Sequence, residues 1–156
     1  HVAVRRQRQM CIRDSFRIIS SAATRERDKF HINKHLAKDV ELKDVTDDYC
    51  VFGVFGPKSR ALMKSISKDN FENDNFRFST AKYITIERTK IWTQRLSYVG
   101  ELGYELYVKS EDAKKIYELL VNKGKNFNLS NCGMHAMACI PQFDRLKFFP
   151  LLTNNS

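Results

Sequence analysis

The residues with the clearest chemical potential lie in the segment 97–108, Ser-Tyr-Val-Gly-Glu-Leu-Gly-Tyr-Glu-Leu-Tyr-Val. Glu105 stands between aromatic residues in an apolar run, where a carboxylate is unusual because strands are depleted in Glu. An ionised carboxylate accepts hydrogen bonds, so Glu105 is a candidate for ligand binding. The alternative is that its side chain simply faces water, and the residue type alone favours this alternative.

The pattern around this segment predicts a β-hairpin. Residues 91–98 and 103–108 are predicted to be strands, and residues 99–102 form the turn between them. Gly100 can adopt the positive φ that such a turn favours. Because side chains alternate along a strand, Tyr104, Leu106 and Val108 share one face, and Glu105 and Tyr107 share the other.

The run Tyr-Val-Gly-Glu-Leu-Gly-Tyr-Glu-Leu resembles the signature of the aminomethyltransferase, or glycine-cleavage T-protein, superfamily. The resemblance extends from about residue 16 to about residue 140, and it includes the Val-x-Gly-Pro-x-Ser-Arg turn at residues 54–60. It implies a module that binds tetrahydrofolate and accepts one-carbon units. The same module forms the C-terminal half of dimethylglycine and sarcosine dehydrogenases, in which a flavin half with FAD oxidises an N-methyl amine.

The resemblance also implies site residues. In the family, the carboxylate at Glu105 faces two adjacent donors on the pterin edge, and the aromatic side chain at Tyr98 contacts the folate. Glu101 and Tyr104 belong to the motif but are expected in the turn and the core. An essential Asp of the family falls within residues 4–8, which are Val-Arg-Arg-Gln-Arg, and Met137 replaces a family Arg. No catalytic residue and no metal ligand are therefore assigned, and we expect this chain alone to be inactive.

The expected fold is α+β, a T-protein-like folate-binding domain. A ferredoxin-like βαββα core, followed by a β-hairpin and a helix, is predicted from strands at 16–20, 40–45 and 50–55 and helices at 24–36 and 57–66. Residues 76–86 are also strand-like. The final helix begins at Ser110, its predicted cap, and ends at Gly124. Its stripe of apolar residues has helical spacing and comprises Ala113, Ile116, Tyr117 and Leu120.

Two features have competing interpretations. The strand-to-helix corner at residues 56–60, with Pro57 at the first helical position, could bind an anion at the helix N-terminus or could simply pack the domain. The second interpretation is favoured. Residues 131–137, which include His135, resemble the start of the family's last helix, but Pro141 would interrupt it. A packed or solvated His135 is favoured over a ligand or base.

The two ends of the chain are expected to be foreign to the domain. Residues 10–15, Met-Cys-Ile-Arg-Asp-Ser, match the translation of a transposon end used in sequencing libraries. Residues 1–15 are therefore interpreted as an assembly artefact rather than an Arg-rich presequence. The partial folate-binding domain is assigned to residues 16–140. Residues 141–156 are interpreted as a divergent or frameshifted tail.

Composition narrows the class of protein. The formal charge is +9, but basic residues alternate with acidic ones, so a solvated surface is favoured over nucleic-acid binding. No apolar run is long enough to span a membrane. The four cysteines lack Cys-x-x-Cys spacing, which indicates a reducing compartment. The expected location is the cytoplasm of a bacterium or the mitochondrial matrix of a eukaryote. A non-catalytic folate- or protein-binding module on the same fold is the rival interpretation.

Overall fold

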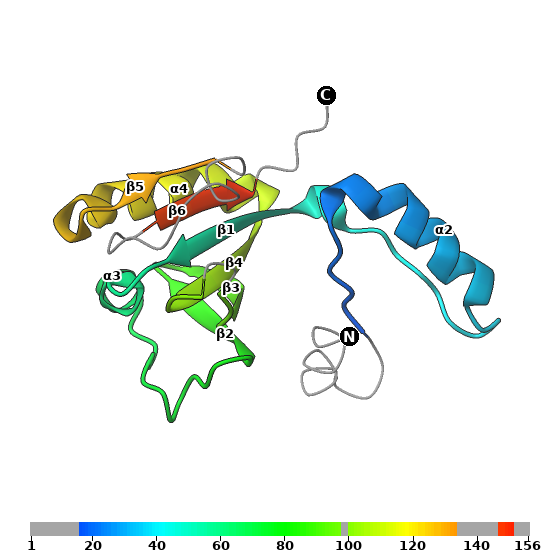
Figure 1. Cartoon of the computed structure of the whole chain (residues 1–156), viewed down its shortest axis with the longest axis horizontal. Helices are drawn as coiled ribbons and strands as arrows, with labels where there is room; N and C mark the ends of the chain where they lie inside the picture. The colour runs from blue at the N-terminus through cyan, green and yellow to red at the C-terminus, as the bar shows by residue number, and fades with distance from the viewer. Residues whose placement is uncertain (1–15, 98–99, 134–146, 152–156) are drawn as a thin grey trace. The chain divides into compact units, whose positions relative to one another are not determined.

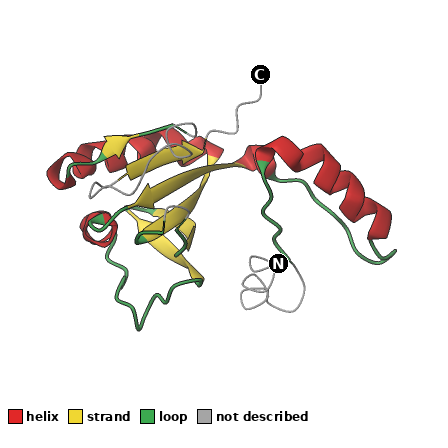
Figure 2. Cartoon of the chain, in the orientation of Figure 1, coloured by secondary structure: helices red, strands yellow, loops and turns green. Residues whose placement is uncertain are grey.

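The computed structural model describes residues 16–97, 100–133 and 147–151. The chain divides into two compact units, residues 1–46 and residues 47–156, and each is described by itself. Figure 1 labels the elements, and Figure 2 distinguishes helices from strands and loops. Within the described ranges, no helix has the length and apolar character required to cross a bilayer.

In the described part of the first unit, helix α2 (Arg25–His35) follows a 3-10 turn, η1 (Ala22–Thr24). The predicted helix after Thr24 is confirmed, and Thr24 is its N-cap residue. The Thr24 hydroxyl does not bond a helix N–H; it lies 3.1 Å from the Ser21 carbonyl oxygen and 2.6 Å from Oδ2 of Asp28. No residue of α2 is buried, which agrees with its weak apolar periodicity.

Asp44, near the end of this unit, forms ion pairs with two basic residues of α2. Its Oδ2 atom lies 2.9 Å from Nε of Arg25 and 3.6 Å from Nζ of Lys29. Its Oδ1 atom accepts hydrogen bonds from the Thr46 backbone N–H at 3.1 Å and from the Thr46 hydroxyl at 2.7 Å. The hydrogen bonds from Arg25 and Thr46 hold the pKa of the Asp44 carboxyl far below its ordinary value.

The strands predicted at residues 16–20 and 40–45 are wrong, because neither described segment forms a strand. Alternating residues make a strand only where a second strand supplies hydrogen bonds, and neither segment has one in the described structure. Asp44 instead bonds the backbone N–H two residues on, which bends the chain into a turn. The opening of the expected βαββα core is therefore absent, and the ferredoxin-like arrangement is not confirmed.

The second unit is built on a mixed sheet with helices on one face. Its strands are β1 (Tyr49–Phe55), β2 (Ala81–Ile86), β3 (Thr89–Gln94), β4 (Gly103–Lys109), β5 (Ser130–Asn131) and β6 (Lys147–Leu151). They are arranged in the order β2-β3-β4-β1-β6-β5, and each neighbouring pair is antiparallel except the parallel pair β5 and β6. A 3-10 turn, η2 (Thr46–Asp48), precedes β1.

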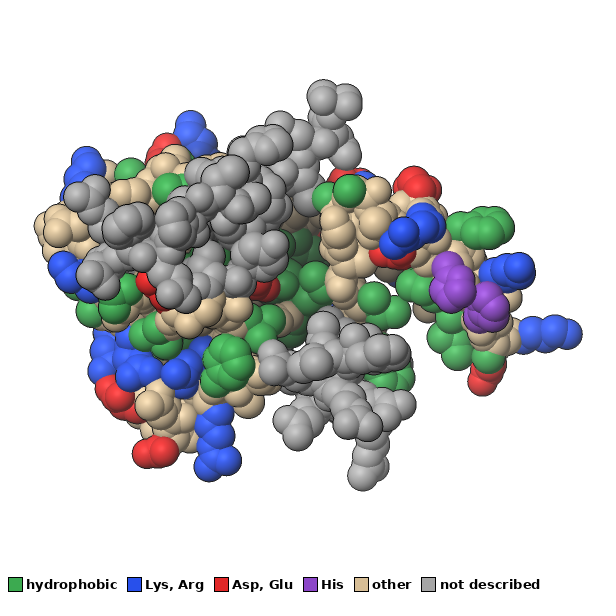
Figure 3. Space-filling model, in the orientation of Figure 1, with side chains coloured by type: hydrophobic (Ala, Val, Ile, Leu, Met, Phe, Trp, Pro, Cys, Tyr) green, Lys and Arg blue, Asp and Glu red, His purple; other side chains and the backbone are tan. Residues whose placement is uncertain are grey.

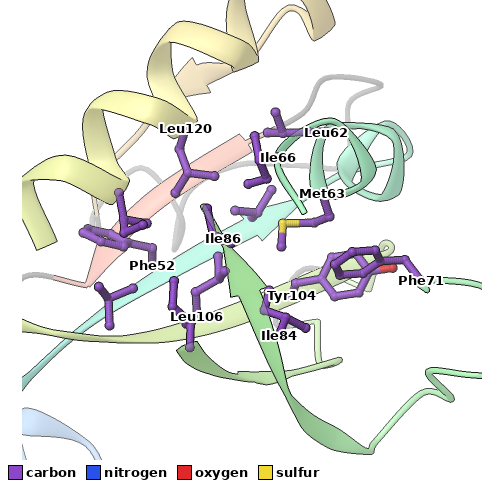
Figure 4. Packing of buried hydrophobic residues seen from close by; sticks show 14 of the residues in the cluster. Phe52, Leu62, Met63, Ile66, Phe71, Ile84, Ile86, Tyr104, Leu106 and Leu120 are labelled. Atoms are coloured by element: carbon purple, nitrogen blue, oxygen red, sulfur yellow. The ribbon is translucent and has the colours of Figure 1, made fainter. Parts of the chain in front are cut away.

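Helices α3 (Ser59–Ile66) and α4 (Ser110–Gly124) cover the core face of this sheet (Figures 1 and 4). The apolar stripe predicted for α4 is confirmed, because Ile116 and Leu120 join the core. Leu62, Met63 and Ile66 of α3 belong to the same core. A further 3-10 turn, η3 (Lys125–Phe127), follows α4. The strands and loops contribute the remaining buried members of this core, which are Phe52, Val54, Phe71, Phe76, Ile84, Ile86, Ile91, Tyr104, Leu106 and Val108.

The predicted starts of two helices differ from the structure. Pro57 precedes α3, whose N-cap is Lys58, because Gly56 and Ser59 close a turn through a 3.0 Å backbone hydrogen bond. Ser110 is the first residue of α4 rather than its cap. Strand β4 runs directly into this helix, and the Ser110 hydroxyl donates to the Asp47 carbonyl oxygen at 2.8 Å instead.

The chain beyond α4 only partly matches the predictions. Asn131 lies in β5, whereas residues 134–137 of the predicted last helix fall outside the described residues. Within the segment interpreted as a divergent tail, residues 147–151 form β6, which pairs with β1. A strand was not predicted there, because the tail matched no recognised pattern.

Candidate functional site

The hairpin of β3 and β4 brings four candidate side chains together on the sheet face opposite the helices. In the antiparallel register, Gln94 lies opposite Glu105, and Trp92 lies opposite Tyr107. Residues directly opposite in such a pair place their side chains on the same face. Because Tyr104, Leu106 and Val108 enter the helix-covered core, Glu105 and Tyr107 must lie on the other face, as predicted.

The turn of this hairpin depends on a glycine. Gly100 has a φ of 79°, so the predicted positive φ is confirmed. This region of backbone conformation is unfavourable for residues with a Cβ atom, especially for β-branched ones. Gly100 thus allows the chain between β3 and β4 to adopt a backbone conformation that other residues disfavour.

Trp92 and Tyr107 form an aromatic pair beside the carboxylate. Their ring centroids are 4.6 Å apart with an interplanar angle of 60°, and each residue is only 7% exposed. Such edge contacts add stability beyond the burial of area. The pair gives this face an apolar surface with the tyrosine hydroxyl at one end.

The Glu105 carboxylate is half-buried and oriented by its neighbour. The Tyr107 hydroxyl donates a hydrogen bond to its Oε2 atom at 3.0 Å. Burial raises the pKa of Glu105 above the ordinary value of 4.5, and the hydrogen bond from Tyr107 partly opposes that rise. Among the described residues, no side chain or backbone group bonds Oε1. Glu105 is therefore not a freely solvated side chain, and it retains capacity to accept further hydrogen bonds.

Gln94 is a polar residue on the same sheet face as Glu105, and it was not among the site residues predicted from the sequence. The residue is 8% exposed, and its Nε2 atom is buried without a hydrogen-bond partner in the described structure. A buried amide normally has a partner, so this one is an exception that requires explanation. The feature that could have identified Gln94 as a site residue is its position opposite Glu105 in the register of β3 and β4.

Gly53 and Gly103 have no side chains, and this leaves room for the ring of Phe55 to pack against the backbone of β1 and β4. Gly53 is opposite Glu105 and Gly103 is opposite Phe55 in the β1–β4 register. A Cβ atom built on Gly53 would lie 2.6 Å from Cε2 of Phe55, and one on Gly103 would lie 2.3 Å from Cδ1. Phe55 is 2% exposed, so its ring fills the space that two side chains would otherwise take.

The remaining motif residues have separate environments. Tyr98 lies outside the described residues, so its predicted folate contact stays a prediction. Tyr104 is fully buried in the core, as expected, in a T-shaped contact with Phe71 at a centroid distance of 5.5 Å. Glu101 lies in the bend before β4, as expected. Within the described structure, Oε2 of Glu101 and Oη of Tyr104 are buried without a hydrogen-bond partner.

The corner before α3 is occupied by internal bonds. The Gly56 N–H donates to the Leu102 carbonyl oxygen at 2.8 Å, and the Ser59 hydroxyl donates to the same atom at 3.2 Å. These bonds fasten the corner to the residue before β4, which supports packing rather than anion binding. The described residues contain no cluster of His, Cys, Asp and Glu able to hold a metal, and His135 falls outside them.

Charged side chains of both signs lie on the described surface. Figure 3 shows Lys and Arg next to Asp and Glu on the described surface. Ion pairs such as Lys115 with Glu87, at 2.6 Å, are part of this mixture. That nucleic acid is not a partner stays a prediction.

Comparison with known proteins identifies several relatives. A family model described as "GCVT N-terminal domain" matches residues 10–140. Human mitochondrial dimethylglycine dehydrogenase is 35% identical over 99 residues, which cover 64% of this chain and 11% of that protein. An aminomethyltransferase from Bacillus licheniformis is 31% identical over 122 residues, covering 78% of this chain and 33% of that protein.

A third relative is named for a different activity. The 4-methylaminobutanoate oxidase (formaldehyde-forming) of Paenarthrobacter nicotinovorans is 30% identical over 126 residues, covering 80% of this chain and 15% of that protein. The chain thus spans between about a tenth and a third of the length of these relatives.

Proposed function

Since this chain belongs to the family of GCVT N-terminal domains, we propose that the β3–β4 hairpin forms part of a tetrahydrofolate-binding site. The chain is then a segment of a folate-dependent aminomethyltransferase module. The observation that carries the proposal is Glu105, a half-buried carboxylate in the middle of β4 with one oxygen held by Tyr107.

The chemistry of the pterin ring suits this carboxylate. Its edge presents a ring N–H beside an exocyclic amine, and two neighbouring carboxylate oxygens can accept both donors. Oε1 has no partner in the described structure, and Oε2 accepts one bond from Tyr107 and can accept another. Burial strengthens such charge-assisted bonds because water competes less for the same atoms.

Other residues would complete the site. The proposed role of Tyr98 is an aromatic contact with the folate from the end of the preceding segment. Trp92 and Tyr107 supply a buried apolar surface beside the carboxylate. When bound, tetrahydrofolate supplies the nitrogen that takes up the one-carbon unit. The residues of this chain bind and orient it, and none is assigned a catalytic role.

The parent protein is proposed to be a dehydrogenase of the dimethylglycine or sarcosine type. The supporting observation is the similarity to a dimethylglycine dehydrogenase, together with Met137 at the position of the T-protein Arg. In this proposal a flavin-containing half of the parent, with FAD, oxidises an N-methyl amine and passes the carbon to this module. The corresponding compartment is the mitochondrial matrix in a eukaryote or the cytoplasm in a bacterium.

We also propose that the partial folate-binding domain comprises residues 16–140, with an assembly artefact at 1–15 and a divergent or frameshifted tail at 141–156. Residues 147–151 of this tail nevertheless pair with β1 as strand β6. The family match ends at the same residue 140 but begins at residue 10. Sequencing the source transcript across both ends tests this proposal. A continuous transcript that encodes residues 1–15 would contradict it.

The test of the folate site is a titration with tetrahydrofolate, followed by calorimetry or fluorescence. Glu105→Gln removes the charge and places an NH₂ group against a ligand donor. The loss of a charge-assisted hydrogen bond, worth about 1.5–3 kcal/mol, should weaken binding about 10- to 150-fold.

The matched control is Glu111→Gln, which makes the same charge change on α4 at a side chain that is 74% exposed. It should leave the affinity unchanged. Equal affinities of the wild type and Glu105→Gln would remove Glu105 from the site. No detectable binding to the wild-type chain would contradict the proposed function as a whole.

A further inference from the structure

We propose that Gln94 determines ligand specificity in the site, by donating a hydrogen bond from Nε2 to the carbonyl oxygen of the pterin ring. This inference rests on the proposed function. It concerns a residue that lies outside the signature run and was not among the predicted site residues.

The first argument is placement. Gln94 and Glu105 are directly opposite in the antiparallel register of β3 and β4, so their side chains share one face. Opposing residues of this kind have Cβ atoms about 5 Å apart. One small planar ligand can therefore contact both side chains at once.

The second argument is the unsatisfied amide. Gln94 is 8% exposed, and its Nε2 atom has no partner among the described residues. The Glu105 carboxylate does not use this donor, because its only bond in the described structure comes from Tyr107. Leaving a buried donor unpaired is unfavourable for folding, which is understandable if a ligand supplies the acceptor.

The third argument is complementarity. The pterin edge presents a carbonyl acceptor, a ring N–H donor and an amine donor in a row. A carboxylate accepts from the two donors, and an amide N–H next to it donates to the acceptor. Gln94 and Glu105 side by side offer this acceptor–donor pattern. With Nε2 facing the ring, replacing the ring carbonyl by an amine would place two donors against each other at Gln94.

The experiment uses tetrahydrofolate and its 4-amino analogue, tetrahydroaminopterin, in which an amine replaces the ring carbonyl and the adjacent ring nitrogen, which faces Glu105, also loses its hydrogen. Since Glu105 is the same in every variant, a change in the affinity ratio on substitution of Gln94 reports on Gln94. The affinity of each is measured by calorimetry under argon for wild type, Gln94→Leu and Gln94→Glu. The readout is the ratio of the two affinities, which a general change in folding does not alter. Asn122→Leu, at an exposed amide on α4, is the control.

The wild type should prefer tetrahydrofolate. Gln94→Leu should reduce the tetrahydrofolate affinity on the order of tenfold and leave that of the analogue nearly unchanged. Gln94→Glu offers an acceptor in place of the donor and should shift the preference towards the 4-amino ligand. Asn122→Leu should keep the wild-type ratio.

The failures of the two proposals are distinguishable. If wild type binds tetrahydrofolate and both Gln94 variants keep its ratio, the role of Gln94 is refuted while the folate site stands. If wild type binds neither ligand, the proposed function fails and the inference fails with it. Gln94→Leu should unfold at the same or a higher urea concentration than wild type, because it removes an unpaired buried donor.

Discussion

The contact of Phe55 with two glycines gives a prediction that separates two similar substitutions. Gly53→Ala places a Cβ atom 2.6 Å from Cε2 and 2.9 Å from Cζ of Phe55. Gly103→Ala places one 2.3 Å from Cδ1 of the same ring and 2.5 Å from the backbone oxygen of Leu96. Real Cβ atoms do not approach other atoms this closely, so both substitutions require movement.

The magnitude follows from two opposing effects. Overpacking of a closed site costs about 1–3 kcal/mol. Replacing a strand glycine by alanine recovers roughly 0.5–1 kcal/mol of backbone entropy. Each single substitution should therefore lower the free energy of unfolding by on the order of 1 kcal/mol. Gly103→Ala should be the more severe, because a backbone oxygen cannot move as a side chain can.

A Phe55→Leu background distinguishes the two sites. Leucine keeps atoms at the Cδ positions but lacks Cε2 and Cζ, which are the atoms nearest Gly53. Gly53→Ala should thus become neutral or stabilising in this background, whereas Gly103→Ala should remain destabilising. Urea unfolding of the complete double-mutant cycles measures these couplings. Equal costs for Gly53→Ala in the wild-type and Phe55→Leu backgrounds would refute the reasoning.

Three other predictions concern single positions. Gly100→Val should destabilise by about 1 kcal/mol or more because its φ is 79°, whereas Gly133→Val, with open space around the Cβ position, should be nearly neutral in urea unfolding. The pKa of Glu105 is raised in the folded state, so the folded protein holds this proton more tightly than the unfolded chain. The contribution of Glu105 to the free energy of unfolding should therefore decrease as the pH rises from below 4.5 through the raised pKa. The free energy of unfolding of Glu105→Gln, measured in urea, should not show this decrease with pH. A pH profile identical to that of the wild type would contradict the claim that burial raises the pKa of Glu105. Asp44→Asn should weaken the bond to Arg25 and accelerate limited proteolysis within residues 37–46, and unchanged cleavage would argue against that tie.

The hairpin and the helices were predictable because their signals are local. Helix α4 has apolar residues at helical spacing, and the same residues face the core. The positive φ of Gly100 was predicted from a turn between two apolar runs. The strand predicted at 91–98 was too long, however, because β3 ends at Gln94 and residues 95–97 are not part of a strand. The burial of Tyr104 and the opposite orientation of Glu105 follow from the period of two.

Features that depend on distant partners could not be predicted in this way. The alternation at 40–45 indicated a strand, but no neighbour pairs with it in the described structure, and Asp44 forms a turn instead. Phe71 enters the core from a segment whose composition indicates a polar loop. Gln94 carries no chemical signal until the register places it opposite Glu105.

The long connection between β1 and β4 also has a consequence for synthesis of the chain. Gly53 and Glu105 pair although they are far apart in sequence, so β1 emerges from the ribosome well before the strand that covers its edge. Such non-local pairs form slowly, because a long loop must close first. Until then the run Cys50–Phe55 is an exposed apolar edge, which favours aggregation or capture by a chaperone. The residues proposed to bind the ligand lie on β3 and β4, so they can meet as soon as that hairpin forms, before β1 is covered.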